Sequence, residues 1–423
     1  MEVRMNTYEL LNPFTPASIA SNPEDFYGRA TEITSIDRNL KQGSLVIQGP
    51  PGIGKSSLLS RVLLHMEGFS SNNNSKVVIA VAHSDIETVD DAARLLLEEL
   101  CVVDEVSKKI SIDLPKLISY ESQKAYNYFA EGRFLSSLLK IIEDKKFKDD
   151  INEANLIIFA IDECDKCPKP IARLIRQILT KTQLNGINSI RFVLAGISPL
   201  YEDLVNEDIG INRFIYKTIN LGKLKPDEAK ELIEDKLYAV VFDVQKSNFK
   251  LDIDPLTIDR VYSLANGHPH LLQLLGSYLI ENENNNPDEI INSYDLVNAL
   301  QEICYETRAT IYDYLMRSLE LHGYYEDFLK FINLSKNNFP TVVDKAKVQQ
   351  FIEPQSILWL LKNNIIAENN NNQFELVDEF LRIRIFLDQE KEKEDASWRV
   401  MEISTADIDN ISDNSHAYWE HYR

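Results

Sequence analysis

Eight consecutive residues have the types and the spacing needed to hold phosphate groups. They read Gly49-Pro50-Pro51-Gly52-Ile53-Gly54-Lys55-Ser56 and match the pattern G-x-x-x-x-G-K-[ST]. Glycines let the backbone turn tightly, so that successive N–H groups and the start of the following helix point at phosphate oxygens. Lys55 would supply a cation to the β and γ phosphates, and Ser56 would offer its hydroxyl to Mg²⁺. The pattern predicts an ATP or ADP site at this loop, continued into the helix by Ser57.

Two adjacent acids, Asp162 and Glu163, follow the apolar run of residues 156–161 (LIIFAI). A pair of charges at the tip of a buried strand is costly unless a ligand or a reaction uses it. Beside a phosphate loop, Asp162 would hold Mg²⁺ through water and Glu163 would polarise the attacking water. Taken alone, the pair could also be two solvated acids that open a surface loop. Together with the loop, it favours nucleotide hydrolysis with Lys55 and Glu163 as catalytic residues.

Cys164 and Cys167 form a C-x-x-C directly after the acids. A structural zinc site needs four ligands, and the sequence has no second pair at a suitable spacing. A redox role would need a thioredoxin-like context, which is absent. We interpret the two cysteines as incidental to function.

The elements that must position these motifs alternate in type through the first half of the chain. Continuous apolar runs predict buried strands at residues 44–48, 76–82, 155–161 and 190–195. Helical spacing is found at residues 57–65 and 88–100. Continuous runs, rather than alternating ones, suit a parallel sheet covered on both faces. We therefore expect an α/β P-loop NTPase core with a parallel sheet.

Composition limits the classes of protein that fit. The chain has 423 residues, 44% of them hydrophobic, and a formal charge of −21. Length and composition suit a folded protein of two or three domains, and the acidic balance disfavours non-specific binding to nucleic acid. Four cysteines are too few for a disulfide framework. With neither a signal peptide nor a membrane span expected, the predicted location is cytoplasmic.

Beyond the phosphate loop and the acidic strand, three further motifs occur in order and resemble a known family. They are Asn12-Pro13-Phe14, then Phe26-Tyr27-Gly28-Arg29-Ala30-Thr31-Glu32, and finally Gly267-His268-Pro269-His270-Leu271-Leu272. The chain resembles the STAND and archaeal-type P-loop ATPases, the signalling branch closest to the initiator ATPases of the AAA+ superfamily. The resemblance covers about residues 12–281 and extends to a winged helix ending near residue 387. It implies ATP or ADP and Mg²⁺ as ligands.

The resemblance also assigns roles to residues outside the loop. Residues 26–29, which are Phe26, Tyr27, Gly28 and Arg29, would close over the adenine and ribose, although they could be an ordinary turn before a helix. Ser198 stands at the position called sensor 1, where relatives commonly carry Asn. Arg213 matches the arginine that reaches a neighbouring subunit's γ-phosphate, although it could also be a surface salt-bridge partner. Pro269 belongs to the turn of the lid that contacts nucleotide.

The lid turn departs from the initiator pattern at one position. His270 stands where initiator ATPases place an arginine. This departure favours the signalling branch.

The expected domains are an ATPase core at residues 1–222, a helical lid at 223–291, a winged-helix-like domain at 292–388 and a tail at 389–423. Helices predicted at residues 325–334, 345–351 and 355–363, followed by a hairpin, give the winged-helix order. Between residues 320 and 387 seven basic residues oppose nine acidic ones, a balance of −2. This is a poor phosphate-binding face, so we expect the domain to pack on the core or on a protein partner, burying Trp359 and Leu360.

These observations lead to one principal hypothesis and two alternatives. The principal hypothesis is an ATP-hydrolysing STAND/AAA+ switch that forms a homo-oligomer on binding ATP and acts through a separately encoded protein partner. Its setting would be a bacterial or archaeal signalling or antiviral defence complex. One alternative is an AAA+ ATPase that acts on DNA in transposition or replication, against which the acidic C-terminal domain counts. The other is a scaffold that binds nucleotide without turnover, against which the intact Lys55, Ser56, Asp162 and Glu163 count.

Overall fold

The computed structural model of the chain describes residues 10–20, 22–68, 76–104, 109–112, 132–143, 156–246, 250–335, 340–369 and 371–393. These residues form two compact units. One comprises residues 19–221, and the other comprises residues 10–18 with residues 222–393. Residues 10–18 thus belong to the same unit as residues 222–393.

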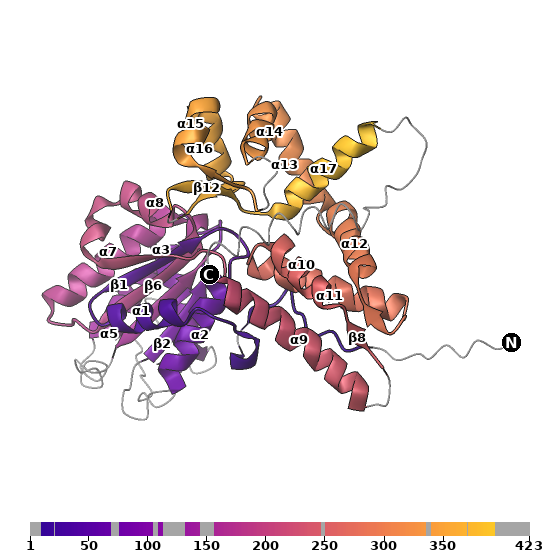
Figure 1. The fold of residues 1–423 in the computed structure, drawn as a ribbon. Coiled ribbons are helices and arrows are strands. Elements are labelled where there is room, and N and C mark those ends of the chain that lie inside the picture. Colours follow the sequence, from indigo (N-terminus) through magenta and orange to yellow (C-terminus); the bar gives the residue numbers. More distant parts are fainter. Residues whose placement is uncertain are drawn as a thin grey trace. The chain divides into compact units, whose positions relative to one another are not determined.

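The unit of residues 19–221 is built on a five-stranded sheet in the order β2-β5-β6-β1-β7 (Figure 1). Every neighbouring pair in this sheet is parallel. The strands are β1 (Ser44–Gly49), β2 (Lys76–Val81), β5 (Ile157–Asp162), β6 (Ile190–Ile197) and β7 (Ile215–Asn220). A separate antiparallel pair joins β3 (Cys101–Asp104) to β4 (Lys109–Ile112). The predicted α/β fold with a parallel sheet is confirmed.

Helices cover both faces of the sheet. In the described residues of this unit the helices are η1 (Pro23–Asp25), α1 (Ala30–Leu40), α2 (Lys55–Gly68), α3 (Val89–Leu100), α5 (Phe134–Glu143), η2 (Cys164–Lys166), α7 (Pro168–Leu184), α8 (Leu200–Glu207) and η3 (Ile209–Arg213). Side chains of β5 alternate between the two cores: Phe159 and Ile161 pack with α3, α5 and α7, whereas Ile158 and Ala160 pack with α1 and α2. Burial on both faces explains why the strands read as continuous apolar runs.

The edge strand β7 is an element that the sequence patterns do not predict. Ile215 and Ile219 are its buried residues, whereas Tyr216, Lys217 and Asn220 are exposed. An edge strand with one solvated side lacks the continuous apolar run that marks its neighbours.

The second unit is mostly helical. Its first part contains α9 (Pro226–Lys246), α10 (Pro255–Ala265), α11 (Pro269–Asn285) and α12 (Ser293–Glu302), with the short parallel pair of β8 (Asp252–Ile253) and β9 (Ile290–Ile291). Its second part contains the π-helical turn η4 (Ile303–Thr307), α13 (Ala309–Leu321), α14 (Tyr325–Leu334), α15 (Lys345–Phe351), α16 (Pro354–Lys362) and α17 (Glu379–Lys393). The three helices predicted for the winged-helix order correspond to α14, α15 and α16.

A three-stranded antiparallel sheet accompanies these last helices. Its strands are β10 (Val342–Asp344), β11 (Ile366–Glu368) and β12 (Gln373–Leu376), in the order β10-β12-β11. The asparagine-rich turn of the predicted hairpin joins β11 to β12, and there Asn372 adopts a φ of 58°. The asparagine run at residues 70–75 and the tail from residue 394 lie outside the described residues.

Residues 10–16, which we call the N-terminal strap, run antiparallel along α11. At one end, Leu10 and Asn284 exchange hydrogen bonds of 2.6 and 3.0 Å between the Leu10 backbone and the Asn284 amide. At the other end, the Pro16 carbonyl lies 3.1 Å from His270 Nδ1. In the middle, the ring of Phe14 lies against Gly276, where an added Cβ would be 2.4 Å from Cε1. Only glycine at 276 leaves room for this ring, which fixes the strap to the helix.

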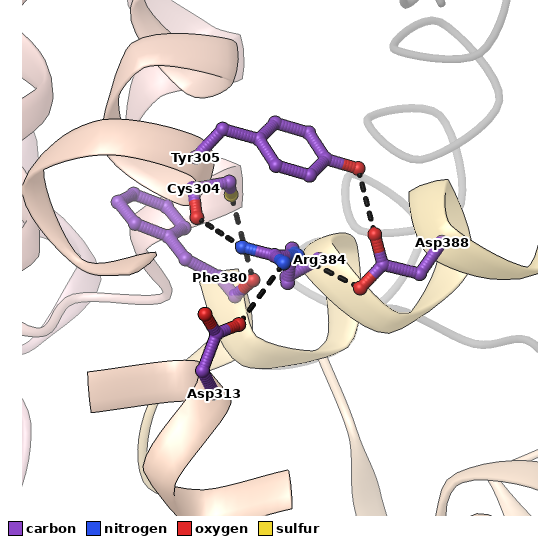
Figure 2. A network of polar contacts seen from close by, with 6 residues as sticks. All are labelled: Cys304, Tyr305, Asp313, Phe380, Arg384 and Asp388. Atoms are coloured by element: carbon purple, nitrogen blue, oxygen red, sulfur yellow. Dashed lines mark hydrogen bonds and ion pairs between the residues drawn. The ribbon is translucent and has the colours of Figure 1, made fainter. Parts of the chain in front are cut away.

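A polar network fastens α17 to the π-helical turn and α13 (Figure 2). The Arg384 guanidinium donates hydrogen bonds to the Cys304 carbonyl at 2.8 Å, to Asp388 at 2.8 Å and to Asp313 at 3.1 Å. The Tyr305 hydroxyl donates to the other oxygen of Asp388 at 3.0 Å. These bonds satisfy a guanidinium that is mostly withdrawn from solvent.

Among the helices of the described ranges, none combines the length and the apolar character that a membrane crossing requires.

Candidate nucleotide-binding site

The predicted motifs meet at one edge of the parallel sheet. In the strand register, Gly49 at the end of β1 pairs with Ile197 at the end of β6, and Ile161 of β5 pairs with Leu194 of β6. The carboxyl ends of parallel strands lie on one side. The phosphate loop after β1, Ser198 after β6 and the acids that end β5 therefore come from three adjacent strands.

The loop has the backbone that its glycines predict. Gly54 has a φ of 94°, which only glycine adopts without strain. An added Cβ at Gly49 would stand 2.4 Å from the carbonyl oxygen of Leu221, so a larger residue could not occupy the start of the loop. Between them, Ile53 is 1% exposed and anchors the loop in the core with α1 and α2. Pro50 is half-buried and Pro51 is exposed.

Lys55 begins α2 and is held over the loop. Its Nζ donates hydrogen bonds to the carbonyls of Gly49 at 3.0 Å and Pro50 at 2.8 Å. Burial lowers the pKa of Lys55, and the opposing charges of Asp165, Asp162 and Glu163 act to raise it. The ammonium thus stands between the loop and three carboxylates. Lys55 Nζ therefore has carboxylates on one side and the phosphate-binding backbone on the other.

The acid pair divides into one buried and one exposed side chain. Asp162 is 7% exposed, and its Oδ1 accepts a hydrogen bond of 2.9 Å from the backbone N–H of Glu163. Glu163 has a φ of 53° and a ψ of 33°, in the left-handed region. For a residue with a side chain this conformation is strained and is typical of functional sites. It turns the Glu163 carboxylate out of the strand into solvent.

The residues present fit a magnesium ion. Carboxylate and hydroxyl oxygens are the protein ligands that Mg²⁺ takes, usually with water between. Within the part of the chain that the structure describes, Asp162 Oδ2 has no protein donor, whereas Oδ1 is used by Glu163. Ser56, half-buried in the first turn of α2, offers the hydroxyl on the loop side. Asp162 and Ser56 are therefore the residues that would hold the ion.

A third acid, Asp165, joins the site without having been predicted. It lies in η2, and its Oδ1 accepts a hydrogen bond of 2.8 Å from the backbone N–H of Ile197, one residue before Ser198. The signal was present as the spacing D-E-x-D, but a surface loop explains that spacing equally well. Its contact with the end of β6 depends on the fold.

The segment of residues 26–29 lies against the loop in the same unit. Phe26 packs on the core shared by α1 and α2, and Gly28 and Arg29 both have positive φ, 67° and 65°. Arg29 is 4% exposed, and its Nη2 donates a hydrogen bond of 3.1 Å to the Ile53 carbonyl. The predicted nucleotide contact of Phe26, Tyr27, Gly28 and Arg29 stays a prediction, and Arg29 has a role in holding the loop.

Ser57, predicted as a nucleotide contact, accepts a hydrogen bond in this unit. The backbone N–H of Ala20 donates a hydrogen bond of 3.1 Å to Ser57 Oγ. The chain that enters the unit is thereby attached to the first turn of α2.

Two predicted residues are not gathered at this edge. Arg213 precedes β7, and the neighbouring Phe214 carbonyl bonds the N–H of Ser44, at the start of β1. Arg213 therefore lies at the amino-terminal ends of the strands, opposite to the phosphate loop. The length of β1 separates the two, which is roughly 16 Å at about 3.3 Å per residue. Its Nη2 donates to Thr180 Oγ1 at 2.7 Å. Pro269 begins α11 in the other unit, so its nucleotide contact stays a prediction.

The lid turn around Pro269 is fixed within its own unit. Gly267 has a φ of 67°, and its carbonyl accepts the N–H of Leu224 at 2.9 Å. Burial lowers the pKa of His270, and the charge of Arg308 acts in the same direction. A neutral imidazole at this position cannot replace the arginine of initiator ATPases as a phosphate-binding cation.

The two cysteines after the acid pair are buried thiols. Burial raises the pKa of Cys164 well above its usual value and raises that of Cys167 to about 11. In the described ranges, no group of three or more His, Cys, Asp or Glu side chains could hold a metal by itself.

Comparisons with known proteins agree with this architecture. Residues 29–195 match the family described as Nephrocystin 3, N-terminal. The Walker-type ATPase PABY2304 of Pyrococcus abyssi has a similar structure, with a TM-score of 0.56 and 16% identity over 88% of this chain and 99% of that chain. The Aeropyrum pernix ORC2 protein, in ADPNP–ADP complexes, has a TM-score of 0.48 and 12% identity over 92% of this chain and 98% of that chain. No curated protein matches the sequence.

The family match covers less than half of the chain, and the structural matches are distant in sequence. The five-stranded parallel sheet with flanking helices and the match to the Pyrococcus abyssi protein agree in fold class. The chain therefore has the fold of the P-loop NTPases.

Proposed function

We propose that the protein binds ATP with Mg²⁺, hydrolyses it and uses the cycle as a STAND/AAA+ switch in a bacterial or archaeal signalling or antiviral defence complex. The observation that supports this best is the meeting of the phosphate loop, Ser198 and the Asp162–Glu163 pair at the ends of three adjacent strands. Hydrolysis needs a phosphate cradle and an acid next to it, and both are present. The likeness to a protein named as a Walker-type ATPase agrees with this reaction.

Each residue has a separate task in the proposed reaction. Lys55 leaves the loop carbonyls and binds the β and γ phosphates, because the phosphates offer a stronger acceptor for its charge. Glu163, which is exposed at the strand tip, orients and polarises the attacking water. Ser198 forms a hydrogen bond with the γ-phosphate. Mg²⁺ supplies positive charge that neutralises the phosphates when it is bound.

The chain that joins the two units supports a switch. Leu221 lies on Gly49 at the start of the loop, and its N–H bonds the Gln48 carbonyl at 2.7 Å. Two residues later, Lys223 Nζ donates to the Leu376 carbonyl at 3.1 Å and lies 3.6 Å from Glu375 of β12.

Leu224, the next residue, bonds the lid turn at Gly267. A short connection that contacts the loop, the C-terminal sheet and the lid turn could transmit a change at any of them. We propose that this connection is the route from nucleotide to output.

Arg213 supports an oligomer as the working form. From the amino-terminal ends of the strands, Arg213 cannot reach the loop of its own chain. Its side chain is exposed, so that a second copy of the chain can contact it. We propose that it completes the neighbouring copy's site when ATP is bound, and that a separately encoded protein receives the signal. The contact with the neighbouring copy and the contact with the separately encoded protein would both use surfaces that are exposed in the single chain.

Action on DNA is the second candidate, because the order of α14, β10, α15, α16, β11 and β12 agrees with the proposed winged helix. The charges do not favour it. In this domain Lys330 pairs with Asp327 at 2.8 Å, Lys345 pairs with Glu368 at 2.8 Å and Lys347 donates to the Leu334 carbonyl at 2.7 Å. Cations already engaged with protein groups have less to offer to phosphates.

The exposed side of α16 carries the apolar Leu358, which is 66% exposed, together with Gln355 and Lys362. Trp359 is half-buried, and its ring lies tilted at 5.2 Å from His322 and 5.6 Å from Tyr324. Leu360 is already fully buried within the single chain. This side suits a protein partner better than a DNA groove.

The proposed function is tested by phosphate release from purified protein with ATP, in the presence and absence of Mg²⁺. We expect Mg²⁺-dependent release that is lost in Lys55→Ala. We also expect ADP to raise the melting temperature of the wild type, since a ligand that binds only the folded state stabilises it. No release and no thermal shift from any nucleotide would contradict the proposal.

A further inference from the structure

Strand β6 extends beyond the partner that pairs with it on one side. The last registered pair between β5 and β6 is Ile161 with Leu194, and β5 ends at Asp162. Three residues further along β6, the N–H of Ile197 would have no strand to bond. Backbone donors near the interior need a partner. The Asp165 carboxylate provides one, because its Oδ1 accepts this N–H at 2.8 Å.

The fit between Asp165 and β6 is close. At Gly196 an added Cβ would stand 2.7 Å from Asp165 Oδ1 and 3.1 Å from the Asp165 nitrogen. Gly196 has an ordinary backbone conformation, since it is not among the residues with positive φ in the described ranges. The glycine is therefore required by space and not by backbone angle. The absence of a side chain there lets the carboxylate reach the end of the strand.

Asp165 also belongs to the short helix that follows the catalytic acid. The N–H of Lys166 bonds the Glu163 carbonyl at 3.0 Å, which closes the turn between Glu163 and Asp165. Asp165 thus lies inside a turn that Lys166 closes onto Glu163, and its carboxylate is bonded to the backbone next to Ser198. Beyond the paired residues of β5 and β6, this side chain links the turn after Glu163 to the end of β6.

We infer that Asp165 is a positioning residue for ATP hydrolysis, which fixes Ser198 relative to Glu163 through its hydrogen bond to the Ile197 N–H. This inference rests on the proposed ATPase function. Asp165 acts through backbone placement and does not contact nucleotide. A side-chain oxygen suits this task, because it can accept the hydrogen bond of a backbone N–H that no strand pairs.

Six variants test the inference. Asp165→Asn keeps an oxygen acceptor of the same shape and removes the charge, whereas Asp165→Ala removes the bond. Gly196→Ala keeps the Asp165 carboxylate in the sequence but places a methyl group where this carboxylate approaches β6. Ser198→Ala removes the group that Asp165 positions, alone and combined with Asp165→Ala. Glu202→Ala, an exposed acid on α8, is the matched control.

For an active wild type, we expect Asp165→Ala and Gly196→Ala each to lower kcat by about 10- to 100-fold, the size of effect that a misplacement of about 1 Å produces. KM for ATP should change by less than about threefold, because the ground-state phosphates are held by the loop. Asp165→Asn should keep kcat within about threefold of the wild type. The double variant Asp165→Ala/Ser198→Ala should be no slower than Ser198→Ala, because both changes remove the same contribution.

A readout independent of turnover accompanies the kinetics. Amide hydrogen exchange of the peptide that contains Ile197 should accelerate in Asp165→Ala and stay slow in Asp165→Asn, because the asparagine oxygen can still accept the bond. Glu202→Ala should change neither exchange nor kcat.

Three results would overturn the inference: additive losses in the double variant, equal damage from Asn and Ala at 165, or a raised KM with kcat unchanged. Additive losses would show that Asp165 does not act through Ser198. Equal damage from Asn and Ala would show that the charge of Asp165 is the important property, and a raised KM would indicate that Asp165 contacts nucleotide. A wild type that hydrolyses no ATP would contradict the proposed function instead. Unchanged exchange in Asp165→Ala would still reject the hydrogen bond as the positioning contact.

Discussion

The Nη2 of Arg29 donates a hydrogen bond of 3.1 Å to the backbone carbonyl of Ile53, in the middle of the phosphate loop. Arg29 is 4% exposed and comes from the turn before α1, whereas Ile53 is inserted into the core beneath the loop. A second contact, at 3.4 Å, joins the same guanidinium to Glu32. The loop is therefore held from below by an apolar side chain and from the side by a cation.

This contact predicts that Arg29 acts on nucleotide affinity through the loop. We expect Arg29→Met to weaken ADP binding by about 10-fold, because a buried charge-assisted hydrogen bond contributes about 1.5–3 kcal/mol and part of this holds the loop in its binding shape. Calorimetric titration with ADP measures the change. Arg38→Met, at an arginine near the end of α1, is the control. An unchanged Kd in Arg29→Met would show that the loop keeps its shape without this bond.

Arg213 is predicted to act on a neighbouring copy. Arg213→Ala should bind ATP as the wild type does and should hydrolyse it about 10³-fold more slowly, the smaller loss known for such arginines. Mixing it with Glu163→Gln should restore part of the activity, because one interface can then combine both intact groups. Lys217→Ala, an exposed cation on β7, is the control. No restoration, with a specific activity independent of protein concentration, would indicate that the single chain is the working form.

The C-terminal elements are predicted not to bind DNA strongly. In addition to the three engaged lysines, Arg382 donates to Thr341 at 2.9 Å and Arg384 binds Asp313 and Asp388. Lys362 is exposed at the end of α16, and Lys336 lies outside the described residues.

The measurement is a titration of the full chain with duplex DNA near physiological salt. We expect a Kd weaker than about 10⁻⁶ M, the tight limit of non-specific binding. Tighter binding with a steep salt dependence would favour the DNA-directed alternative.

His270 predicts a pH dependence of stability. It lies 3.1 Å from the Pro16 carbonyl of the N-terminal strap, and burial and the charge of Arg308 lower its pKa. Because the folded protein then binds this proton less readily than the unfolded chain, acid favours unfolding. The contribution is present above about pH 6.5, the value of unfolded histidine, and is lost as the pH falls towards the lower folded value. Asp378 opposes the shift and limits its size.

The measurement is urea unfolding between pH 5 and pH 7.5 for the wild type, His270→Gln and the control His322→Gln, whose imidazole is exposed. One proton gives a slope of at most about 1.4 kcal/mol per pH unit. His270→Gln should lose part of the wild-type slope and His322→Gln should keep it. Equal slopes in all three proteins would remove His270 from the pH dependence.

The motifs that could be predicted are those whose residues are close together in the sequence. Residues 49–56 carry their own geometry, because loop glycines and a helix start suffice to form a phosphate cradle. The buried strands β1, β5 and β6 could be predicted because two covered faces impose an apolar run on each of them. The apolar run of β2 was also recognised, although Ile79 and Val81 on this edge strand are exposed. The predicted helices at residues 325–334 and 345–351 coincide with α14 and α15.

The features that the patterns do not predict depend on residues far apart in the chain. The bond between Asp165 and Ile197 requires β5 and β6 to be neighbours, and the position of Phe14 requires Gly276, 262 residues away. Neither requirement leaves a periodic signal. Arg29 was predicted from its motif, but the resemblance gave no sign of its bond to the loop. Such roles follow from contacts, which only the folded chain defines.

The most direct test of the account is the nucleotide that remains bound to Glu163→Gln after incubation with ATP and Mg²⁺, compared with Lys55→Ala. If Lys55 grips the phosphates and Glu163 serves only the attacking water, Glu163→Gln should hold ATP with wild-type affinity and turn it over at least about 10²-fold more slowly. Lys55→Ala should hold little nucleotide, because its charge-assisted bonds to the phosphates are lost. The account predicts intact ATP on Glu163→Gln and almost none on Lys55→Ala. ADP formed by Glu163→Gln at the wild-type rate would contradict it.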